Sequence, residues 1–276
     1  MRFKIVGDSC CDLTKEQLDK GYFFSVPLIL TVGGVDVIDD ESFEQEKFLD
    51  MVAACPDCPK SSCPSPEAYI ERFDDAEDIY VVTLSSKLSG SYNSAVLARQ
   101  IYLEDHPDVN IHVFDSKTAA AGQHAICAKL EELCLAGKSF EEIVREVEDF
   151  IDKEVTVFVL DNLDTMRKNG RMSKVKAVFA SVLNIKPVLI GVDGEIEMQD
   201  QARGMNKALN KLLHYIEKQD RDGSRTAYIS SCASQERCKN VRKILLEKLG
   251  FKKVVIVEAN GLSSMYMNRG GVIVSF

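Results

Sequence analysis

The stretch EDIYVVTLSSKLSGSYNSAVLARQIYLEDHPDVNIHVFDS, residues 77–116, decides the fold class. It begins with an apolar strand pattern at residues 77–84, continues through a helical pattern at residues 90–105, and ends in a second strand pattern at residues 109–116. A strand, a helix and a strand in this order predict a parallel pair, because parallel strands need a long crossover between them.

The same alternation extends over the rest of the first half of the chain. Strand patterns are predicted at residues 3–8 and 23–32, and helical patterns at residues 12–21, 65–73 and 120–138. We therefore expect an α/β protein whose N-terminal domain, residues 1–153, has a parallel sheet with helices on both faces.

The second half has a different pattern, which predicts a C-terminal domain at residues 154–276 with a mixed sheet and helices. A hairpin is predicted at residues 185–202, with Asp193-Gly194 at its turn. The other predicted elements are a strand at 155–160, one or two helices over 163–183 with an Asn-Gly break, helices at 203–218 and 234–248, and strands at 226–231, 252–259 and 271–276.

Composition and charge favour a globular protein over a membrane-spanning or nucleic-acid-binding one. The chain has 276 residues, of which 45% are hydrophobic and 28% charged, as is typical of a soluble globular protein. Its net charge of −9 argues against sequence-independent binding to nucleic acid or to anionic lipid surfaces. The sequence has no apolar run of the roughly 18–20 residues that a membrane span needs, and no signal-peptide pattern. We expect a cytoplasmic protein.

The nine cysteines do not form an obvious framework. Their number is odd, which favours free thiols in a reducing compartment. One loop contains three of them, Cys55, Cys58 and Cys63. A structural zinc site needs a second pair of ligands, but the sequence has no second C-x-x-C that could supply it. A thioredoxin-like C-x-x-C would follow a strand, whereas this one follows a helical pattern. We interpret the segment as a loop with incidental thiols and no metal; a metal or redox protein is the third hypothesis.

Polar loops follow several predicted strands. Residues 8–13, 61–66, 85–95 and 116–122 are rich in Ser, Thr and Gly. In a parallel sheet such loops meet at one edge, where hydroxyls and backbone N–H groups can bind an anion. No nucleotide-binding glycine motif and no G-x-S-x-G elbow is present. A serine-dependent hydrolase or transferase is the second hypothesis, but His124, its candidate base, lies within a predicted helix.

Six motifs in this order and spacing resemble the DegV family. They are DSCCDL (8–13), VPL (26–28), KSSCPSP (60–66), SSKLSGSYNSA (85–95), VFDSKTAAAG (113–122) and LDTMRKNGRMS (163–173). The resemblance implies a protein of two α/β domains that binds a long-chain fatty acid. It also implies a cargo subunit without catalytic residues or a cofactor, which holds the fatty acid while a separate ATP-dependent kinase subunit phosphorylates its carboxylate.

The resemblance also implies which residues bind the ligand. Ser61 and Ser89 match the hydroxyls that hold the carboxylate in the family, with Ser62 and Gly90 beside them. Tyr266 falls where the family commonly has a histidine, and its hydroxyl can donate one hydrogen bond.

Two arginines match further family positions, and one apolar segment is a candidate tunnel wall. Arg171 and Arg203 are implied to support the headgroup or the kinase partner. Residues 175–192 could line the tunnel for the acyl chain or equally form an ordinary core.

Overall fold

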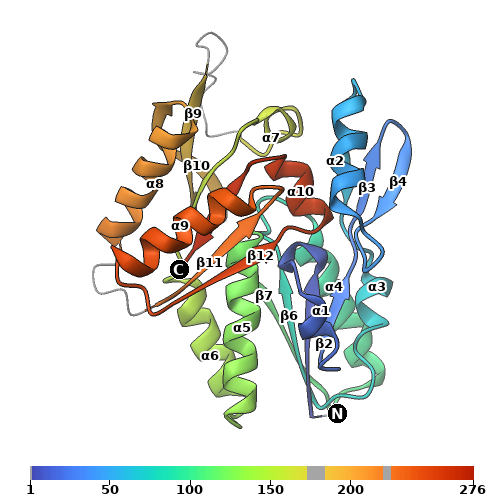
Figure 1. The fold of residues 1–276 in the computed structure, drawn as a ribbon. Helices are drawn as coiled ribbons and strands as arrows, with labels where there is room; N and C mark the ends of the chain where they lie inside the picture. The colour runs from blue at the N-terminus through green and yellow to red at the C-terminus, as the bar shows by residue number, and fades with distance from the viewer. Residues whose placement is uncertain (1, 173–183, 220–224) are drawn as a thin grey trace.

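A computed structural model describes residues 2–172, 184–219 and 225–276. The strands in these ranges form one parallel sheet, one mixed sheet and one small antiparallel sheet (Figure 1). In the described parts of the chain, no helix is long and apolar enough to cross a bilayer.

The first sheet is parallel throughout, as predicted. Its strands run in the order β2 (Phe23–Val26), β1 (Phe3–Asp8), β6 (Asp78–Thr83) and β7 (Asn110–Asp115). The helices of this half are α1 (Lys15–Leu18), α2 (Gln45–Ala54), α3 (Pro66–Ile70), α4 (Ser91–Asp105), α5 (Ala121–Leu135) and α6 (Phe140–Ile151), with a 3₁₀ turn, η1 (Ser9–Cys11), after β1.

Helices cover both faces of this sheet because its strands carry apolar residues on both sides. On β6, Ile79 and Val81 pack with Ala95 of α4, whereas Tyr80 and Val82 pack with Ile126 of α5. Successive side chains of a strand point to opposite faces, so the unbroken apolar run predicts two covered faces.

The second sheet is mixed, which confirms the hairpin prediction for this half. Its strands run in the order β10 (Glu195–Arg203), β9 (Ile185–Val192), β8 (Thr156–Val159), β13 (Val272–Ser275), β11 (Thr226–Ser231) and β12 (Lys253–Glu258). Of these pairs, β11 and β12 are parallel and the others antiparallel. Asp193 and Gly194 form the hairpin turn with positive φ angles of 47° and 80°.

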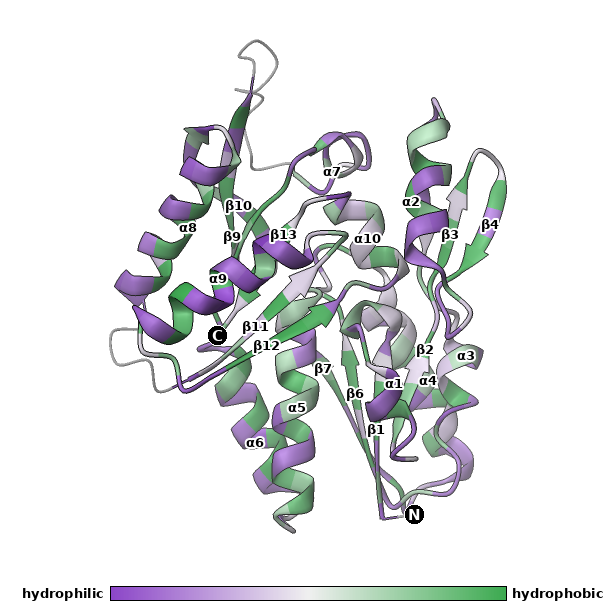
Figure 2. Ribbon diagram, viewed as in Figure 1, coloured by the Kyte–Doolittle hydropathy of each residue, from purple (hydrophilic) through white to green (hydrophobic). Residues whose placement is uncertain are grey.

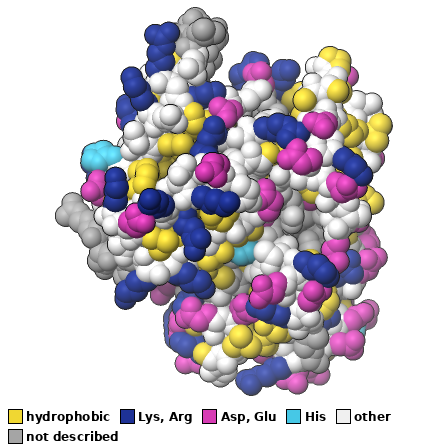
Figure 3. Space-filling model, viewed as in Figure 1, with side chains coloured by type: hydrophobic (Ala, Val, Ile, Leu, Met, Phe, Trp, Pro, Cys, Tyr) yellow, Lys and Arg dark blue, Asp and Glu magenta, His cyan; other side chains and the backbone are white. Residues whose placement is uncertain are grey.

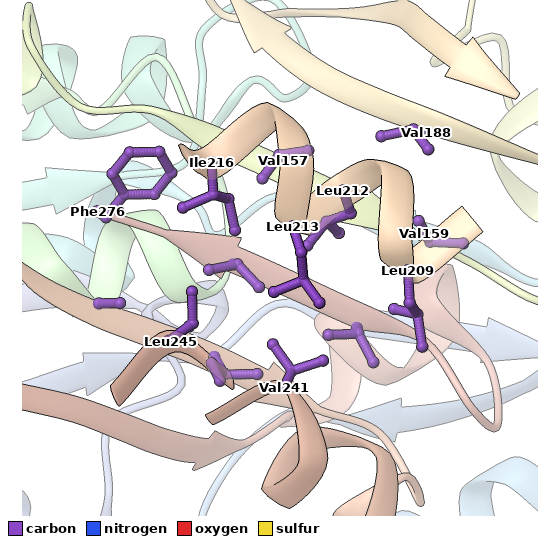
Figure 4. Packing of buried hydrophobic residues seen from close by; sticks show 14 of the residues in the cluster. Val157, Val159, Val188, Leu209, Leu212, Leu213, Ile216, Val241, Leu245 and Phe276 are labelled. Carbon is purple, nitrogen blue, oxygen red and sulfur yellow. The ribbon is translucent and has the colours of Figure 1, made fainter. Parts of the chain in front are cut away.

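Two helices cover the outer face of the second sheet. These helices, α8 (Met205–Gln219) and α9 (Gln235–Glu247), alternate between hydrophilic and hydrophobic residues along their length (Figure 2). Leu209, Leu212 and Ile216 of α8 pack toward the sheet, where they contact a buried cluster that also contains Val157 (Figure 4).

One predicted strand was wrong. The run at residues 23–32 was expected to be continuous, but β2 ends at Val26 and β3 (Ile29–Val32) belongs to another sheet. Pro27 lies at the break, where its missing N–H cannot continue a ladder. The strand β3 instead pairs with β4 (Val35–Ile38) and β5 (Lys60–Ser62) in a three-stranded antiparallel sheet.

Two helices of the structure, α6 and the short helix α10 (Gly261–Met267), were not predicted from the sequence. Within the predicted helical region 163–183, the structure has α7 (Asp164–Lys168), and residues 173–183 lie outside the described residues. Most of the candidate tunnel wall at 175–192 is therefore not described.

Helices connect the two larger sheets by packing against elements of both halves of the chain. Helix α5 contacts strands of both sheets, and α10 contacts α2 and η1 (Figure 1). All strands of the first sheet precede residue 116, and all strands of the second follow residue 155. The division into domains 1–153 and 154–276 stays a prediction.

Candidate functional site

A cavity of about 390 Å³ lies between the two larger sheets. Its apolar lining comes from both halves of the chain and includes Leu28, Leu84, Phe158, Ile196 and Ile273. Among the described residues, its polar and charged lining comprises Ser61, Ser62, Ser89, Lys117, Thr118, Thr156, Arg171, Glu195, Ser263 and Tyr266. The cavity thus combines apolar walls with a set of hydroxyl groups.

The first pair of predicted residues lies on β5. Ser61 pairs with Leu30 of β3, and Ser61 and Ser62 both line the cavity. The chain then enters α3 through the predicted cap, because Ser65 Oγ accepts a hydrogen bond from Ala68 N at 3.4 Å. The strand pairing and the cap hold the two ends of this loop.

The second pair of predicted residues precedes α4. Ser89 Oγ accepts a hydrogen bond from Ser91 N at 3.2 Å. A Cβ added to Gly90 would lie 3.0 Å from Cys63 Sγ, so the glycine allows the two loops to approach closely. The structure therefore brings Ser61, Ser62, Ser89 and Gly90 together on one cavity.

Tyr266 also lines this cavity, although it lies on α10 rather than in a loop. The same helix contributes Leu262, Ser263 and Met267 to the lining. Tyr266 is partly buried and packs against two apolar clusters, one of which contains Phe158 and the other Leu28.

The two predicted arginines have different places. Arg171 lines the cavity, and its Nε donates to the carbonyl oxygen of Leu88 at 3.2 Å. A second guanidinium bond goes to the carbonyl oxygen of Asn169. Arg203 is exposed at the end of β10 and is not part of the described cavity lining.

Behind the cavity wall lies the buried carboxyl group of Asp8. It accepts hydrogen bonds from Leu84 N at 2.8 Å and from Gln123 Nε2 at 2.9 Å. Burial raises the pKa of Asp8 to about 6. Burial also raises the pKa of the Cys10 thiol well above its usual value, so Cys10 contributes a neutral thiol to the cavity.

The only histidine considered as a base does not line the cavity. His124 is buried on α5, and its Nδ1 lies 3.2 Å from the carbonyl oxygen of Cys11 and 3.3 Å from that of Asp12. Burial lowers the pKa of His124. It is therefore not placed to take a proton from Ser61 or Ser89.

The clustered cysteines are divided between two hollows. Cys63 lines the cavity, while Cys55 and Cys58 line a separate hollow beside α7. All three are free thiols. Among the residues that the structure describes, no group of three His, Cys, Asp or Glu side chains is arranged to hold a metal ion.

Sequence reasoning missed part of the lining. Phe158 and Ile273 lie on strands β8 and β13, and their apolar runs resemble any buried strand. Thr118 belongs to a polar loop that was singled out, but nothing in its sequence separates it from a helix cap. Ser263 lies three residues before Tyr266 on α10, and only the tyrosine matched a family position.

Comparisons with known proteins agree over the whole chain. The family model described as "Uncharacterised protein, DegV family" matches residues 2–276. A DegV domain-containing protein of Streptococcus gordonii is 35% identical over 280 residues, covering 100% of this chain and 99% of the relative.

Two similar solved structures contain fatty acids. A DegV family protein of Ruminococcus gnavus, refined with vaccenic acid, has a TM-score of 0.95 and 42% identity, with 99% of each chain covered. The Fatty Acid Kinase (Fak) B3 protein of Streptococcus pneumoniae, loaded with linoleic acid, has a TM-score of 0.92 and 32% identity, with 100% of this chain and 99% of that chain covered.

Proposed function

This chain belongs to the DegV family, and we propose that it is a carrier that binds a long-chain fatty acid in the cavity between its two larger sheets. The carboxylate is held by Ser61 and Ser89, with Ser62, Gly90 and Tyr266 beside it. The acyl chain lies against the apolar walls. The protein itself carries out no chemical step.

The observation that carries this proposal is the combination of hydroxyl groups and apolar walls in one cavity. Burying about 15 methylenes at roughly 0.8 kcal/mol each is favourable by on the order of 12 kcal/mol before the costs of association. The headgroup contacts then need only orient the ligand and satisfy its charge, because an unpaired buried carboxylate would be costly. The fatty acids in two similar structures support the same ligand class.

We further propose that the protein presents its fatty acid to a separate ATP-dependent kinase subunit, which forms an acyl phosphate. The likeness to the pneumococcal Fatty Acid Kinase (Fak) B3 protein supports this role. Arg171 lines the cavity and offers a cation to the phosphorylated headgroup. Arg203 is exposed away from the cavity lining, where a partner subunit can reach it. A cytoplasmic location follows from a partner that uses ATP.

Mass spectrometry tests the ligand class directly. The purified protein is measured under native and then denaturing conditions, and the released small molecules are identified. We expect a long-chain fatty acid at close to one equivalent, and rebinding of that acid after delipidation. A delipidated protein that binds no fatty acid at micromolar concentration would refute the carrier function.

A coupled assay tests the partner. The loaded protein is mixed with ATP and a fatty acid kinase catalytic subunit, and acyl phosphate is measured. Arg171→Ala should retain fatty-acid binding and lose product formation, whereas the parent forms product. Product formation that is unchanged in Arg171→Ala would remove this residue from the proposed role.

A further inference from the structure

Helix α10 carries two polar groups of the cavity, Ser263 and Tyr266, on only two turns of helix. So short a helix has little stability of its own, because helix nucleation is unfavourable and few hydrogen bonds follow it. The orientation of its side chains therefore depends on contacts that hold the helix from outside. Two of these contacts come from Asp12 Oδ1, which accepts a hydrogen bond from Asn260 N at 2.8 Å, and from Gln45 Nε2, which donates to Ser264 Oγ at 3.1 Å.

The first turn of α10 is itself bonded to Asp39, which follows β4 and is 2% exposed. Asp39 Oδ1 accepts a hydrogen bond from Gly261 N at 2.6 Å, and Oδ2 accepts one from Leu262 N at 2.8 Å. Both donors belong to the first turn of α10, where backbone N–H groups have no partner within the helix. Asp39 thus binds the beginning of α10 with both of its carboxylate oxygens.

The same carboxylate is connected through Ser9 to Leu28, another residue of the cavity lining. Ser9 Oγ donates to Asp39 Oδ2 at 2.7 Å and accepts a hydrogen bond from Leu28 N at 3.1 Å. The backbone N–H of Asp39 also donates to the carbonyl oxygen of Leu28 at 3.0 Å. Leu28 lines the cavity, whereas neither Ser9 nor Asp39 is among its described lining residues.

The first residue of α10, Gly261, packs closely against the Asp39 side chain. A Cβ added to Gly261 would lie 2.6 Å from Asp39 Oδ1 and 2.7 Å from Leu30 Cδ1. Such distances are shorter than van der Waals contact, so only glycine lets α10 approach the carboxylate this closely. Gly261 therefore allows the beginning of α10 to lie directly against the Asp39 carboxylate.

We propose that Asp39 is the positioning residue of the headgroup site: through its bonds to Gly261, Leu262 and Ser9 it fixes α10 so that Tyr266 and Ser263 face the ligand's carboxylate. This inference rests on the proposed function, since it assumes that the carboxylate lies beside α10. Asp39 does not touch the ligand. Because hydrogen bonds from Ser263 and Tyr266 are directional, a shift of α10 should weaken carboxylate binding more than the non-directional contacts of Leu262 and Met267 with the acyl chain.

The test compares two ligands with the same acyl chain, a long-chain fatty acid and the corresponding primary alcohol, on delipidated protein. In the parent the acid should bind more tightly than the alcohol. Asp39→Asn places an amide N–H₂ against backbone N–H donors, so the acid-to-alcohol affinity ratio should fall roughly tenfold, the size expected for one misplaced hydrogen bond to a charged group. The alcohol should lose less affinity than the acid, because its binding depends mainly on apolar contacts.

Two further variants complete the design. Ser9→Ala removes one hydrogen bond to Asp39 and retains both bonds between Asp39 and α10. The acid-to-alcohol affinity ratio should therefore also fall, but by a smaller factor. This variant replaces Asp39→Asn in the test if Asp39→Asn does not fold. Asp78→Asn is the matched control, because Asp78 lies at the start of β6, the end away from Leu84, and its Oδ1 accepts from Asn110 Nδ2. Its ratio should equal that of the parent.

The outcomes separate this inference from the carrier function. A folded Asp39→Asn that keeps the parent's ratio, or that loses equal affinity for acid and alcohol, would overturn the role of Asp39. An unchanged ratio in Ser9→Ala would do the same if Asp39→Asn does not fold. A parent that binds neither ligand would overturn the proposed function and this inference together.

Discussion

At the scale of single residues, the candidate site depends on hydroxyl groups that come from loops distant in the sequence. Ser61 and Ser89 line the same cavity from β5 and from the loop before α4. Replacing both with alanine should weaken fatty-acid binding by roughly 1.5–3 kcal/mol for each hydrogen bond to the charged group. The measurement is a titration with a fluorescent fatty acid, with circular dichroism as the control for the fold. Binding equal to that of the parent would mean that the carboxylate lies elsewhere.

Tyr266 offers a second test of the headgroup site. Tyr266→Phe retains the ring and removes the hydroxyl, so fatty-acid affinity should fall by roughly 1–3 kcal/mol if an acceptor is left unpaired. Tyr266→His supplies a donor that becomes charged as the pH falls toward about 6.5, so its affinity should rise as the solution is acidified. Affinity is measured for the three proteins between mildly acidic and neutral pH. Three identical pH profiles would place Tyr266 away from the carboxylate.

The buried carboxyl group of Asp8 leads to a prediction about how the free energy of unfolding depends on pH. Its pKa is about 6 in the folded protein, against an ordinary value of 3.8, so the folded state binds a proton more tightly than the unfolded state. A raised carboxyl pKa means that the free energy of unfolding falls as the pH rises from the ordinary pKa to the folded one. The contribution of this group is about 3 kcal/mol over that window.

The variant Asp8→Asn isolates this contribution. Parent and variant are unfolded with urea at several values between pH 4 and 7, and the difference between their free energies of unfolding is plotted against pH. The parent should lose stability relative to the variant as the pH rises, since only the parent must ionise a buried group. A difference that does not change with pH would show that Asp8 has an ordinary pKa.

The sequence could indicate some of these residues, for physical reasons that differ from one to the next. Ser89 and Gly90 belong to the polar loop 85–95 after a predicted strand, where parallel sheets bind ligands, and the family resemblance then identified these two residues within it. Asp39 carried no such signal, because its role depends on the backbone of α10, more than 200 residues further along the chain. Contacts of that range are invisible to local patterns.

At the scale of secondary-structure elements, local patterns worked where periodicity is strong. The helix predicted at 90–105 is observed as Ser91–Asp105, and the Asp193-Gly194 hairpin has the expected turn. Local patterns failed where tertiary contacts determine the secondary structure. Helix α10 follows no strong helical pattern and is held by Asp39, and the run at 23–32 is divided between two sheets at Pro27.

For the loop that contains Cys55 and Cys58, we predict that replacing the thiols changes neither stability nor fatty-acid binding. Cys55 and Cys58 are half-buried free thiols between α2 and β5, and the described residues around them form no metal cluster. Replacing both with serine should leave the melting temperature and fatty-acid affinity close to those of the parent, because half-exposed thiols contribute little packing. Elemental analysis accompanies both measurements. Stoichiometric zinc in the parent, lost in the double variant, would contradict the interpretation as a loop with incidental thiols.

At the scale of the whole molecule, the surface and the interior have separate roles. On the face shown in Figure 3, positive and negative side chains are interspersed, with no large region of one sign. The net charge of −9 keeps the molecule in solution and offers no strong attraction to the ligand's carboxylate at a distance. Ligand binding therefore depends on the interior, where both halves of the chain line one cavity.

This shared cavity predicts how the ligand changes thermal stability. Leu28 and Ser89 line it from the first half of the chain, and Phe158 and Tyr266 from the second, so a bound fatty acid contacts both. A ligand that binds only the folded state adds about 2.7 kcal/mol at a free concentration of 100 times its Kd. For a protein of this size that corresponds to a rise in Tm of roughly 5–10 °C.

Thermal unfolding of the delipidated protein, with and without fatty acid, measures this coupling. If the two halves unfold together, the single transition should move upward as a whole. If they unfold separately, the lower transition should move upward toward the upper one, because the ligand is lost when the first half opens and cannot stabilise the second half alone. The methyl ester of the same acid is the matched control, since it retains the acyl chain and lacks the charge, and its shift should be smaller. A fatty acid that leaves the lower transition unchanged and raises only the upper one would mean that the ligand is bound by the more stable half alone, and the cavity between the sheets would not be its site.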